Sequence, residues 1–216
     1  RQMCIRDSCW YMENEGFDLE RRENYTYRGH DNSKVPENFN TFYFSRGDIQ
    51  VTIFYEPIIN GKKNIGENGI GLYRNTSIAF PKDWQIDKLL NEEFGIRQGS
   101  YYCPDYVIKI QKQDRVDYII MDAKFSRLDQ VKSVYLPCLA YKYLFSLSPL
   151  GQADHILGLC LVNGKSFEME DAIFDVYDLA EEGHRICPFA RILTLTENEA
   201  ENDRRHQQLI KTVLSV

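Results

Sequence analysis

The stretch PDYVIKIQKQDRVDYIIMDAK, residues 104–124, decides the fold because two apolar runs flank a short polar segment. Runs of this length that are rich in Val, Ile and Tyr are typical of β-strands. A tight turn centred on Gln113 and Asp114 would pair Lys112 with Arg115, so that the numbers of cross-strand partners add up to 227. The sequence therefore predicts an antiparallel hairpin with a defined register.

Three charged residues fall on one face of this hairpin. Successive side chains of a strand point to opposite faces, so Asp122 and Lys124 share a face. In the predicted register Asp105 lies directly opposite Asp122, and opposed residues have Cβ atoms about 5 Å apart. Two carboxylates this close repel by roughly 3 kcal/mol at an effective dielectric of about 20. A shift of one residue in the register would separate them.

The repulsion between the two carboxylates calls for a compensating cation. Lys124 offsets part of it, and a divalent cation with oxygen ligands would offset it fully. Carboxylate oxygens without a neighbouring His or Cys favour Mg²⁺ or Mn²⁺ over zinc. Such a metal activates a water and stabilises charge on a phosphate oxygen, and Lys124 could orient that water. The alternative is a set of solvated charges at strand ends, which are common.

The rest of the chain predicts a mixed α/β sheet around this hairpin. Residues 41–59 contain two β-rich runs around a Ser-Arg-Gly-Asp turn, and residues 128–147 have apolar positions at helical spacing. The continuous apolar run at 155–164 is typical of a strand covered on both faces. Other expected elements are a helix tail ending at Gly16 and followed by a charged turn, a helix at 81–96, strands within 172–179 and 191–196, and a helix from about 199 to 214.

Bulk properties restrict the class of protein. The 216 residues, 43% of them hydrophobic, suit one domain, and the net charge of −6 with a pI near 5.3 differs from the basic surface of proteins that bind nucleic acid by their overall field. A nucleic-acid role would need a local basic groove, a metal or another domain. The sequence contains no apolar run that could span a membrane and no signal-peptide pattern. Six cysteines without a CxxC pair predict reduced thiols in a cytoplasmic protein.

The first eight residues, RQMCIRDS, resemble a translated sequencing-adapter scar. Such a segment is excluded from fold reasoning. We therefore expect residues 1–8 to be non-native and residues 9–216 to form a single domain that is truncated at its N-terminus.

Pro104-Asp105 followed by Asp122-Ala123-Lys124 resembles the signature of the PD-(D/E)XK nuclease superfamily in its D-x-K form. The flanks YYCPDYVIKI and DYIIMDAKFS, with Tyr141 in the next helix, are similar to a bacterial subgroup. That subgroup is the nuclease-like C-terminal part of large proteins related to the nuclease subunit of modification-dependent restriction systems. The resemblance covers residues 41–165 and implies an α/β fold with a restriction-endonuclease-like mixed β-sheet core flanked by helices.

The resemblance also implies a chemistry: Mg²⁺-dependent hydrolysis of DNA phosphodiester bonds in a bacterial defence or restriction system. Asp105 and Asp122 would be metal ligands, the backbone carbonyl of Ala123 a further ligand, and Lys124 the group facing water and phosphate. The implied partners are DNA and an upstream domain or an NTPase. An alternative from another class is a catalytically inactive nuclease-like fold that serves as a protein or nucleic-acid interaction module. A Schiff-base enzyme using Lys124 is a third interpretation.

The sequence departs from the superfamily pattern at two places. The usual glutamate of the first core helix is either replaced by Glu13 or Glu15 or was lost upstream. The Gln found four residues before the helix tyrosine in related nucleases is Pro137 here. Glu56 is a further candidate for the metal shell.

Two surface features have both a functional and a structural interpretation. A basic edge formed by Lys62, Lys63 and Arg74 could bind a phosphate backbone, or these residues could belong to a solvated loop. Tyrosines around the hairpin could stack on bases or could pack in the core; they are Tyr101, Tyr102, Tyr106 and Tyr118.

Overall fold

The structure is a computed structural model of the chain. It describes residues 9–23, 40–61, 69–74, 101–124, 147–150, 157–163, 172–174 and 190–194, together with positions 139, 142, 143, 200, 203, 204, 207, 208, 211 and 214. Among these residues, no helix has the length and apolar character needed to cross a membrane.

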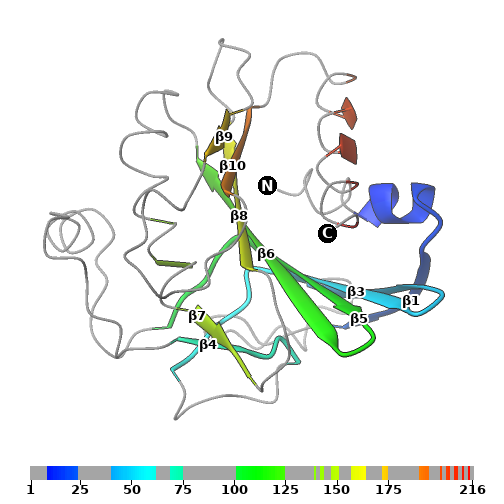
Figure 1. The fold of residues 1–216 in the computed structure, drawn as a ribbon, viewed down its shortest axis with the longest axis horizontal. Helices are drawn as coiled ribbons and strands as arrows, with labels where there is room; N and C mark the ends of the chain where they lie inside the picture. Colours follow the sequence, from blue (N-terminus) through cyan, green and yellow to red (C-terminus); the bar gives the residue numbers. More distant parts are fainter. Residues whose placement is uncertain are drawn as a thin grey trace, which may run out of the picture.

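An eight-stranded mixed sheet forms the centre of the protein, in the order β1-β2-β3-β5-β6-β8-β10-β9 (Figure 1). Its strands are β1 Asp18–Glu23, β2 Thr41–Arg46, β3 Ile49–Tyr55, β5 Tyr106–Lys112, β6 Arg115–Lys124, β8 Leu157–Asn163, β9 Ala172–Phe174 and β10 Ala190–Thr194. The run from β1 to β6 is antiparallel, whereas β6, β8 and β10 are parallel to one another. The predicted mixed sheet is thus confirmed, and it is mostly antiparallel.

The register of the decisive hairpin agrees with the prediction. β5 pairs with β6 from Lys112↔Arg115 to Tyr106↔Met121. Gln113 takes a left-handed conformation, with φ of 52°, in the two-residue turn. The predicted hairpin of residues 41–59 is confirmed as well: β2 and β3 are joined through Gly47, whose positive φ of 62° suits glycine.

Predictions for the flanking elements had mixed outcomes. The apolar run at 155–164 contains β8, which lies between β6 and β10, and the predicted late strands contain β9 and most of β10. Residues 9–14 are helical, and Gly16 follows them with φ of 79°. The described positions from 200 to 214, and positions 139, 142 and 143, are also helical. The predicted helix at 81–96 lies outside the described residues.

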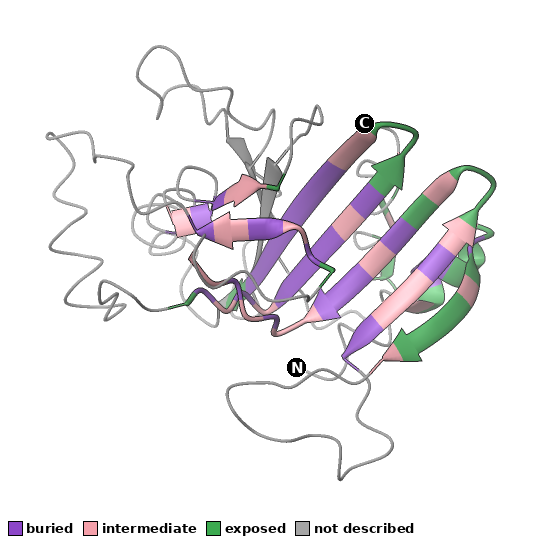
Figure 2. Ribbon diagram, turned by 90° about the horizontal axis from the view of Figure 1, so that it is seen from below, coloured by how far each residue is buried: buried purple, intermediate pink, exposed green. Residues whose placement is uncertain are grey.

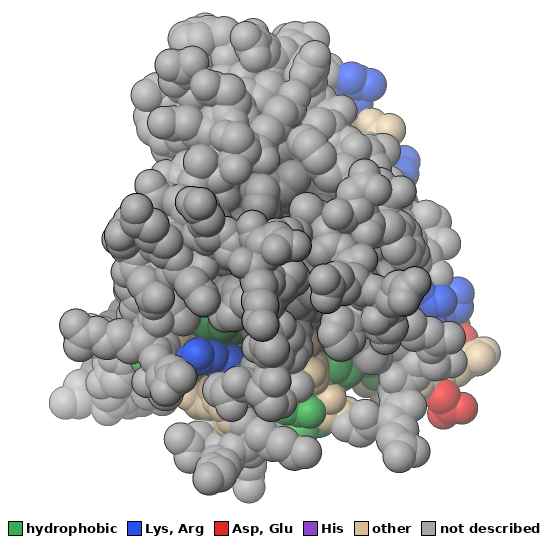
Figure 3. Space-filling view, turned by 60° about the vertical axis from the view of Figure 1, so that its left-hand side comes forward, with side chains coloured by type: hydrophobic (Ala, Val, Ile, Leu, Met, Phe, Trp, Pro, Cys, Tyr) green, Lys and Arg blue, Asp and Glu red, His purple; other side chains and the backbone are tan. Residues whose placement is uncertain are grey.

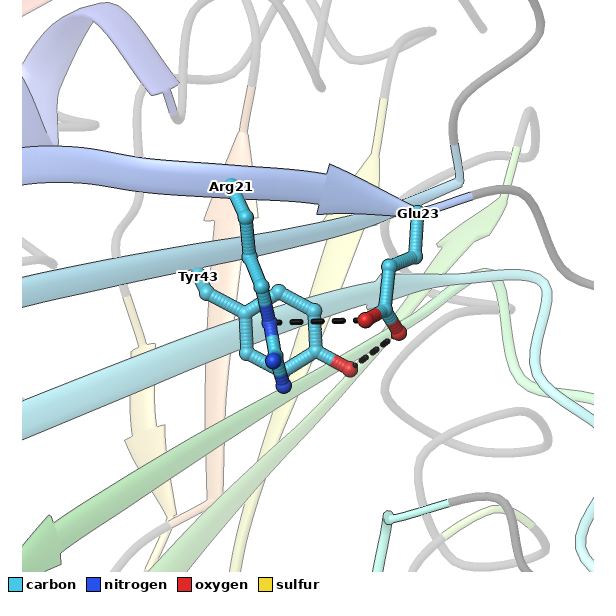
Figure 4. A network of polar contacts seen from close by, with 3 residues as sticks. All are labelled: Arg21, Glu23 and Tyr43. Carbon is cyan, nitrogen blue, oxygen red and sulfur yellow. Dashed lines mark hydrogen bonds and ion pairs between the residues drawn. The ribbon is translucent and has the colours of Figure 1, made fainter.

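The predicted charged turn after Gly16 was wrong, because this segment forms the edge strand β1. Charged side chains are common on edge strands, where they discourage pairing with another chain. In β1 the Arg21 guanidinium lies 4.0 Å from the centre of the Tyr43 ring, and the Tyr43 hydroxyl donates a 2.7 Å hydrogen bond to Glu23 (Figure 4). Burial, followed by the hydrogen bond to Glu23, raises the pKa of Tyr43. The network attaches β1 to its only described neighbour, β2.

Apolar side chains cover both faces of the central strands, which are buried along much of their length (Figure 2). Because successive side chains of a strand point to opposite faces, these apolar residues form one layer on each face of the sheet. The first face carries a core cluster that includes Tyr11, Phe17, Ile53, Ile108 and Ile119. The second face carries the residues that alternate with these; the buried ones in β5 and β6 are Val107, Tyr118, Ile120 and Asp122.

A short second sheet, which the sequence did not predict, lies near this second face. It pairs β4, Leu72–Arg74, with β7, Leu147–Pro149. Two cross-strand partners bind the chain that leads into β4: Lys109 donates to the Gly69 carbonyl at 2.9 Å, and Tyr118 donates to the Gly71 carbonyl at 3.4 Å. Gly71 has φ of 75°, and a Cβ at this position would meet the Tyr118 hydroxyl at 2.8 Å. The sheet therefore requires glycine at Gly71.

Replacement of Gly71 by alanine should destabilise the protein by about 2 kcal/mol, because a side chain at positive φ is strained and the new methyl group meets Tyr118. The cost should be smaller in a Tyr118→Phe background, where the clashing hydroxyl is absent. Urea unfolding of the two single variants and the double variant measures this coupling. Strict additivity would contradict the proposed contact.

Stability at alkaline pH should depend on Tyr118. Burial raises its pKa to about 12 from the usual value of 10, so the folded state holds this proton more tightly than the unfolded state does. The resulting stabilisation, roughly 3 kcal/mol, is complete below pH 10 and is lost as the pH rises through 12. Urea unfolding between pH 9 and 12 should therefore show a shallower decline for Tyr118→Phe. Parallel declines would refute this assignment.

Candidate functional site

Two aspartates face each other at one end of the β5–β6 hairpin. Asp122 lies in β6, and continuing the register by one residue places Asp105, which directly precedes β5, opposite it. Lys112 and Arg115 flank a two-residue turn and therefore form a hydrogen-bonded pair. Hydrogen-bonded and non-hydrogen-bonded pairs alternate along an antiparallel ladder. Counting from the turn, the two aspartates occupy a non-hydrogen-bonded position. Opposed Cα atoms there are only about 4.5 Å apart. We refer to Asp105 and Asp122 as the acid pair.

Asp122 is buried, with 6% of its surface exposed, and it accepts a hydrogen bond from a tyrosine. The Tyr143 hydroxyl donates to Asp122 Oδ2 at 3.0 Å. Burial, followed by the charge of Asp122 and the hydrogen bond to it, raises the pKa of Tyr143 well above its ordinary value, and Asp105 adds to the effect. Tyr143 therefore remains a neutral donor, and it fixes the orientation of the buried carboxylate.

Asp105 binds the backbone beside its partner. The Ala123 N–H donates to Asp105 Oδ2 at 2.7 Å, so this N–H points toward the β5 side. In an antiparallel ladder the N–H and C=O of one residue point to the same neighbour, so the Ala123 carbonyl also faces that side. The residue opposite Ala123 is Pro104, which has no N–H to donate to this carbonyl. The acid pair and the Ala123 carbonyl thus present oxygen atoms to one region.

Glu56 directly follows β3, the strand on the other side of β5, and lies next to Asp105. Its N–H donates to the Asp105 carbonyl at 2.7 Å, and Cys103 Sγ contacts the Glu56 carbonyl at 3.4 Å. Glu56 has φ of 46°, a conformation that favours glycine. Its backbone is therefore next to the acid pair. Within the described parts of the chain, however, no three metal-ligating side chains gather closely enough to hold an ion.

The remaining predicted site residues have different positions. Lys124 ends β6 two residues after Asp122, and its side chain lies outside the described part of the chain, as do Tyr141 and Pro137. Glu15 lies beside the short helix of residues 9–14, whose Tyr11 and Met12 belong to the core cluster on the first face, and it pairs with Lys211 at 3.4 Å. The structure therefore does not bring Glu15 to the acid pair.

The tyrosines and the basic loop separate into buried and exposed groups. Tyr102, Tyr106 and Tyr118 are buried, so the packing interpretation is confirmed for these three, whereas Tyr101 is 43% exposed. Arg74 is also buried, with its guanidinium 4.8 Å from the centre of the Tyr102 ring. The solvated-loop interpretation is wrong for Arg74, and Lys62 and Lys63 lie outside the described residues.

Sequence analysis missed Tyr143 as a site residue. Tyr143 is one of the apolar positions at helical spacing within residues 128–147, a pattern that predicts packing and not a site, and its side chain is indeed fully buried. A buried tyrosine usually needs a hydrogen-bond partner for its hydroxyl, and this requirement could have indicated that Tyr143 contacts a polar group. The partner itself, 21 residues away, depends on how the helix packs against the sheet.

In comparisons with protein-family models, curated proteins and solved structures, none matched the chain. The chemistry of the site therefore has to be inferred from its own residues. Two carboxylates and a carbonyl are hard oxygen donors, and Mg²⁺ is commonly held by one or two carboxylates together with waters and substrate phosphates. The donor set at the acid pair fits such a cation.

Replacing Tyr143 with phenylalanine should destabilise the fold by about 1.5–3 kcal/mol, because the buried carboxylate of Asp122 loses a hydrogen-bond donor. Tyr101→Phe removes an exposed hydroxyl close in the sequence and should change the unfolding free energy by less than about 0.5 kcal/mol. Urea unfolding of both variants at pH 7 provides the measurement. Equal effects would argue against the Tyr143–Asp122 bond.

Proposed function

We propose that the chain is a metal-dependent endonuclease domain that hydrolyses DNA phosphodiester bonds. The observation that carries this proposal is the acid pair: two aspartates opposed on neighbouring strands, with the Ala123 carbonyl turned toward the same side. Carboxylates brought this close need a cation, and the oxygen donors select a hard divalent one. A bacterial restriction or defence context, a cytoplasmic location and an upstream domain or NTPase partner form part of the same proposal.

The order of the central strands supports a restriction-endonuclease-like core. β3, β5 and β6 are consecutive antiparallel neighbours, and β8 then adds to β6 in parallel. A mixed arrangement of four strands is what the resemblance would lead one to expect, so it supports the proposal; Asp122 lies in β6 and Asp105 directly precedes β5. Helical residues 139, 142 and 143 belong to the connection between β6 and β8.

In the proposed mechanism, Asp105, Asp122 and the Ala123 carbonyl would hold Mg²⁺ or Mn²⁺. When bound, this metal supplies a water of lowered pKa and neutralises charge on the phosphate oxygens. Tyr143 keeps Asp122 in one orientation through its 3.0 Å hydrogen bond. Lys124, two residues beyond Asp122 on β6, orients the water or stabilises the negative charge that develops on the phosphate.

A second candidate is a catalytically inactive nuclease-like module that binds protein or nucleic acid. It is favoured by the finding that, over the described residues, no third acidic side chain joins the acid pair to complete a metal site. Calorimetric titration with Mn²⁺ separates the two candidates. The nuclease should release or absorb heat that disappears in Asp122→Asn, whereas the inactive module should show no metal-dependent heat.

Cleavage of supercoiled plasmid in Mg²⁺ or Mn²⁺ tests the proposed reaction. Asp105→Asn, Asp122→Asn and Lys124→Ala should each lower the rate by roughly a hundredfold or more, since the first two remove a proposed metal ligand and the third removes the cation that faces water and phosphate. Asp114→Asn, in the exposed turn at the other end of the same hairpin, is the matched control and should cut at the wild-type rate. Wild-type rates in all three site variants would exclude the mechanism.

A further inference from the structure

Tyr101 is an exposed aromatic residue at the acid-pair end of the hairpin. Its surface is 43% exposed, whereas that of its neighbour Tyr102 is 5% exposed. Tyr101 lies four residues before Asp105, so their Cα atoms are at most about 14 Å apart. Phosphates of one DNA strand follow one another about every 3.4 Å along the helix axis, so this distance spans about four nucleotides. A strand whose phosphate lies at the acid pair therefore has bases within reach of Tyr101.

Backbone hydrogen bonds hold the segment that carries Tyr101. The Tyr102 N–H donates to the Ile59 carbonyl at 2.9 Å, and the Ile59 N–H donates to the Tyr102 carbonyl at 2.8 Å. Ile59 is fully buried, so this bridge is fixed to the interior of the protein. The exposed ring of Tyr101 is thus attached to a backbone that is held on its C-terminal side.

The same segment packs against the residue that orients the acid pair. The rings of Tyr102 and Tyr143 are nearly perpendicular, at 89°, with their centres 6.1 Å apart. Lys142 Nζ lies 5.1 Å from the centre of the Tyr102 ring and 4.9 Å from that of Tyr143. The Tyr143 hydroxyl in turn donates to Asp122. Packing around Tyr102 therefore connects the backbone at Tyr101 with the buried carboxylate.

Two other large hydrophobic side chains are exposed in the described part of the chain, and neither combines an aromatic ring with this position. Trp10, 53% exposed, belongs to the short helix of residues 9–14, whose Tyr11 lies in the core cluster on the first face. The side chains of the acid pair lie on the second face. Leu150, 43% exposed, follows β7 and has no ring. Tyr101 is therefore the described residue best placed for stacking near the acid pair.

Charge gives this chain little overall attraction for DNA. The net charge is −6, and the acid pair places two carboxylates at the site itself. On the face shown in Figure 3, the described Lys and Arg side chains lie as separate groups, one of them beside hydrophobic side chains. Stacking of a base on an aromatic ring needs no net charge and is worth roughly five- to 150-fold in affinity per base. Such a contact would offset part of the electrostatic repulsion.

We propose that Tyr101 stacks on an unpaired base of the DNA strand bound at the acid pair, an inference that rests on the proposed function. In a duplex, both faces of a base are covered by its neighbours in the stack. Taking a paired base out of the stack costs about as much as one aromatic contact returns, whereas an unpaired base has no such cost. The substrate class is therefore DNA with unpaired bases within a few nucleotides of the cleaved phosphate.

Binding to single-stranded and duplex DNA tests this role without cleavage. Fluorescence anisotropy is measured in Mn²⁺ with a labelled 20-nucleotide strand and with the corresponding duplex, both carrying phosphorothioate linkages that resist hydrolysis. Tyr101→Ala should weaken binding of the single strand about tenfold, because the ring is lost, and should change duplex binding by less than about twofold. Tyr101→Phe keeps the ring and should bind both DNAs like the wild type. Neither variant removes a charge, so the salt dependence of log K should be unchanged.

The control is Trp10→Ala, which removes an exposed aromatic ring of the first face and should bind both DNAs like the wild type. A structural role for the Tyr101 ring would lower the Tm of Tyr101→Ala and weaken binding of both DNAs alike, which would overturn the inference. Unchanged binding of the single strand by Tyr101→Ala, or an equal loss in Tyr101→Phe, would also overturn it, even if the wild type cleaves plasmid.

Two further outcomes separate the inference from the proposed function. A tenfold loss confined to the single strand, together with no plasmid cleavage by the wild type, would keep Tyr101 as a base contact and overturn the nuclease proposal. Absence of binding of the wild type to either DNA would overturn both.

Discussion

The register of the β5–β6 hairpin determines how Asp105, Asp122 and the Ala123 backbone lie relative to one another. Because side chains alternate along a strand, a shift of one residue would move Asp122 away from Asp105 and turn its neighbours to the wrong face. Apolar side chains on both faces resist such a shift: Val107 and Ile120 are fully buried on one face, and Ile108 is buried on the other. The register that packs the core therefore also fixes the geometry of the acid pair.

Burial of Asp122 is unfavourable for stability and informative about function. A carboxylate with 6% exposure loses solvation, and the hydrogen bond from Tyr143 offsets part of that loss. Nearby Asp105 adds repulsion, and the raised pKa of Tyr143 reflects both charges. Ionisable groups in unfavourable electrostatic environments are concentrated at functional sites of proteins. A bound cation would remove most of this cost, which is the physical reason for proposing the acid pair as a metal site.

Features that depend on local patterns were predictable from the sequence, and features that depend on distant packing were not. The hairpin turns, the helix end at Gly16 and the central strand β8 each follow from residues close together in the chain. β1 was missed because its charged residues do not alternate like a half-buried strand. β4 and β7 have three residues each, and the pair Leu72↔Pro149 joins residues 77 positions apart. The acid pair followed from the register, whereas Tyr143 and Lys142 required the position of a helix.

The tyrosines around the site connect opposite charges that would otherwise be difficult to hold together. Tyr143 accepts the ammonium of Lys142 on its ring and donates its hydroxyl to Asp122, so one side chain stabilises a cation and an anion through different parts. The hydroxyl is a neutral donor, so it orients the Asp122 carboxylate without adding a charge to the acid pair.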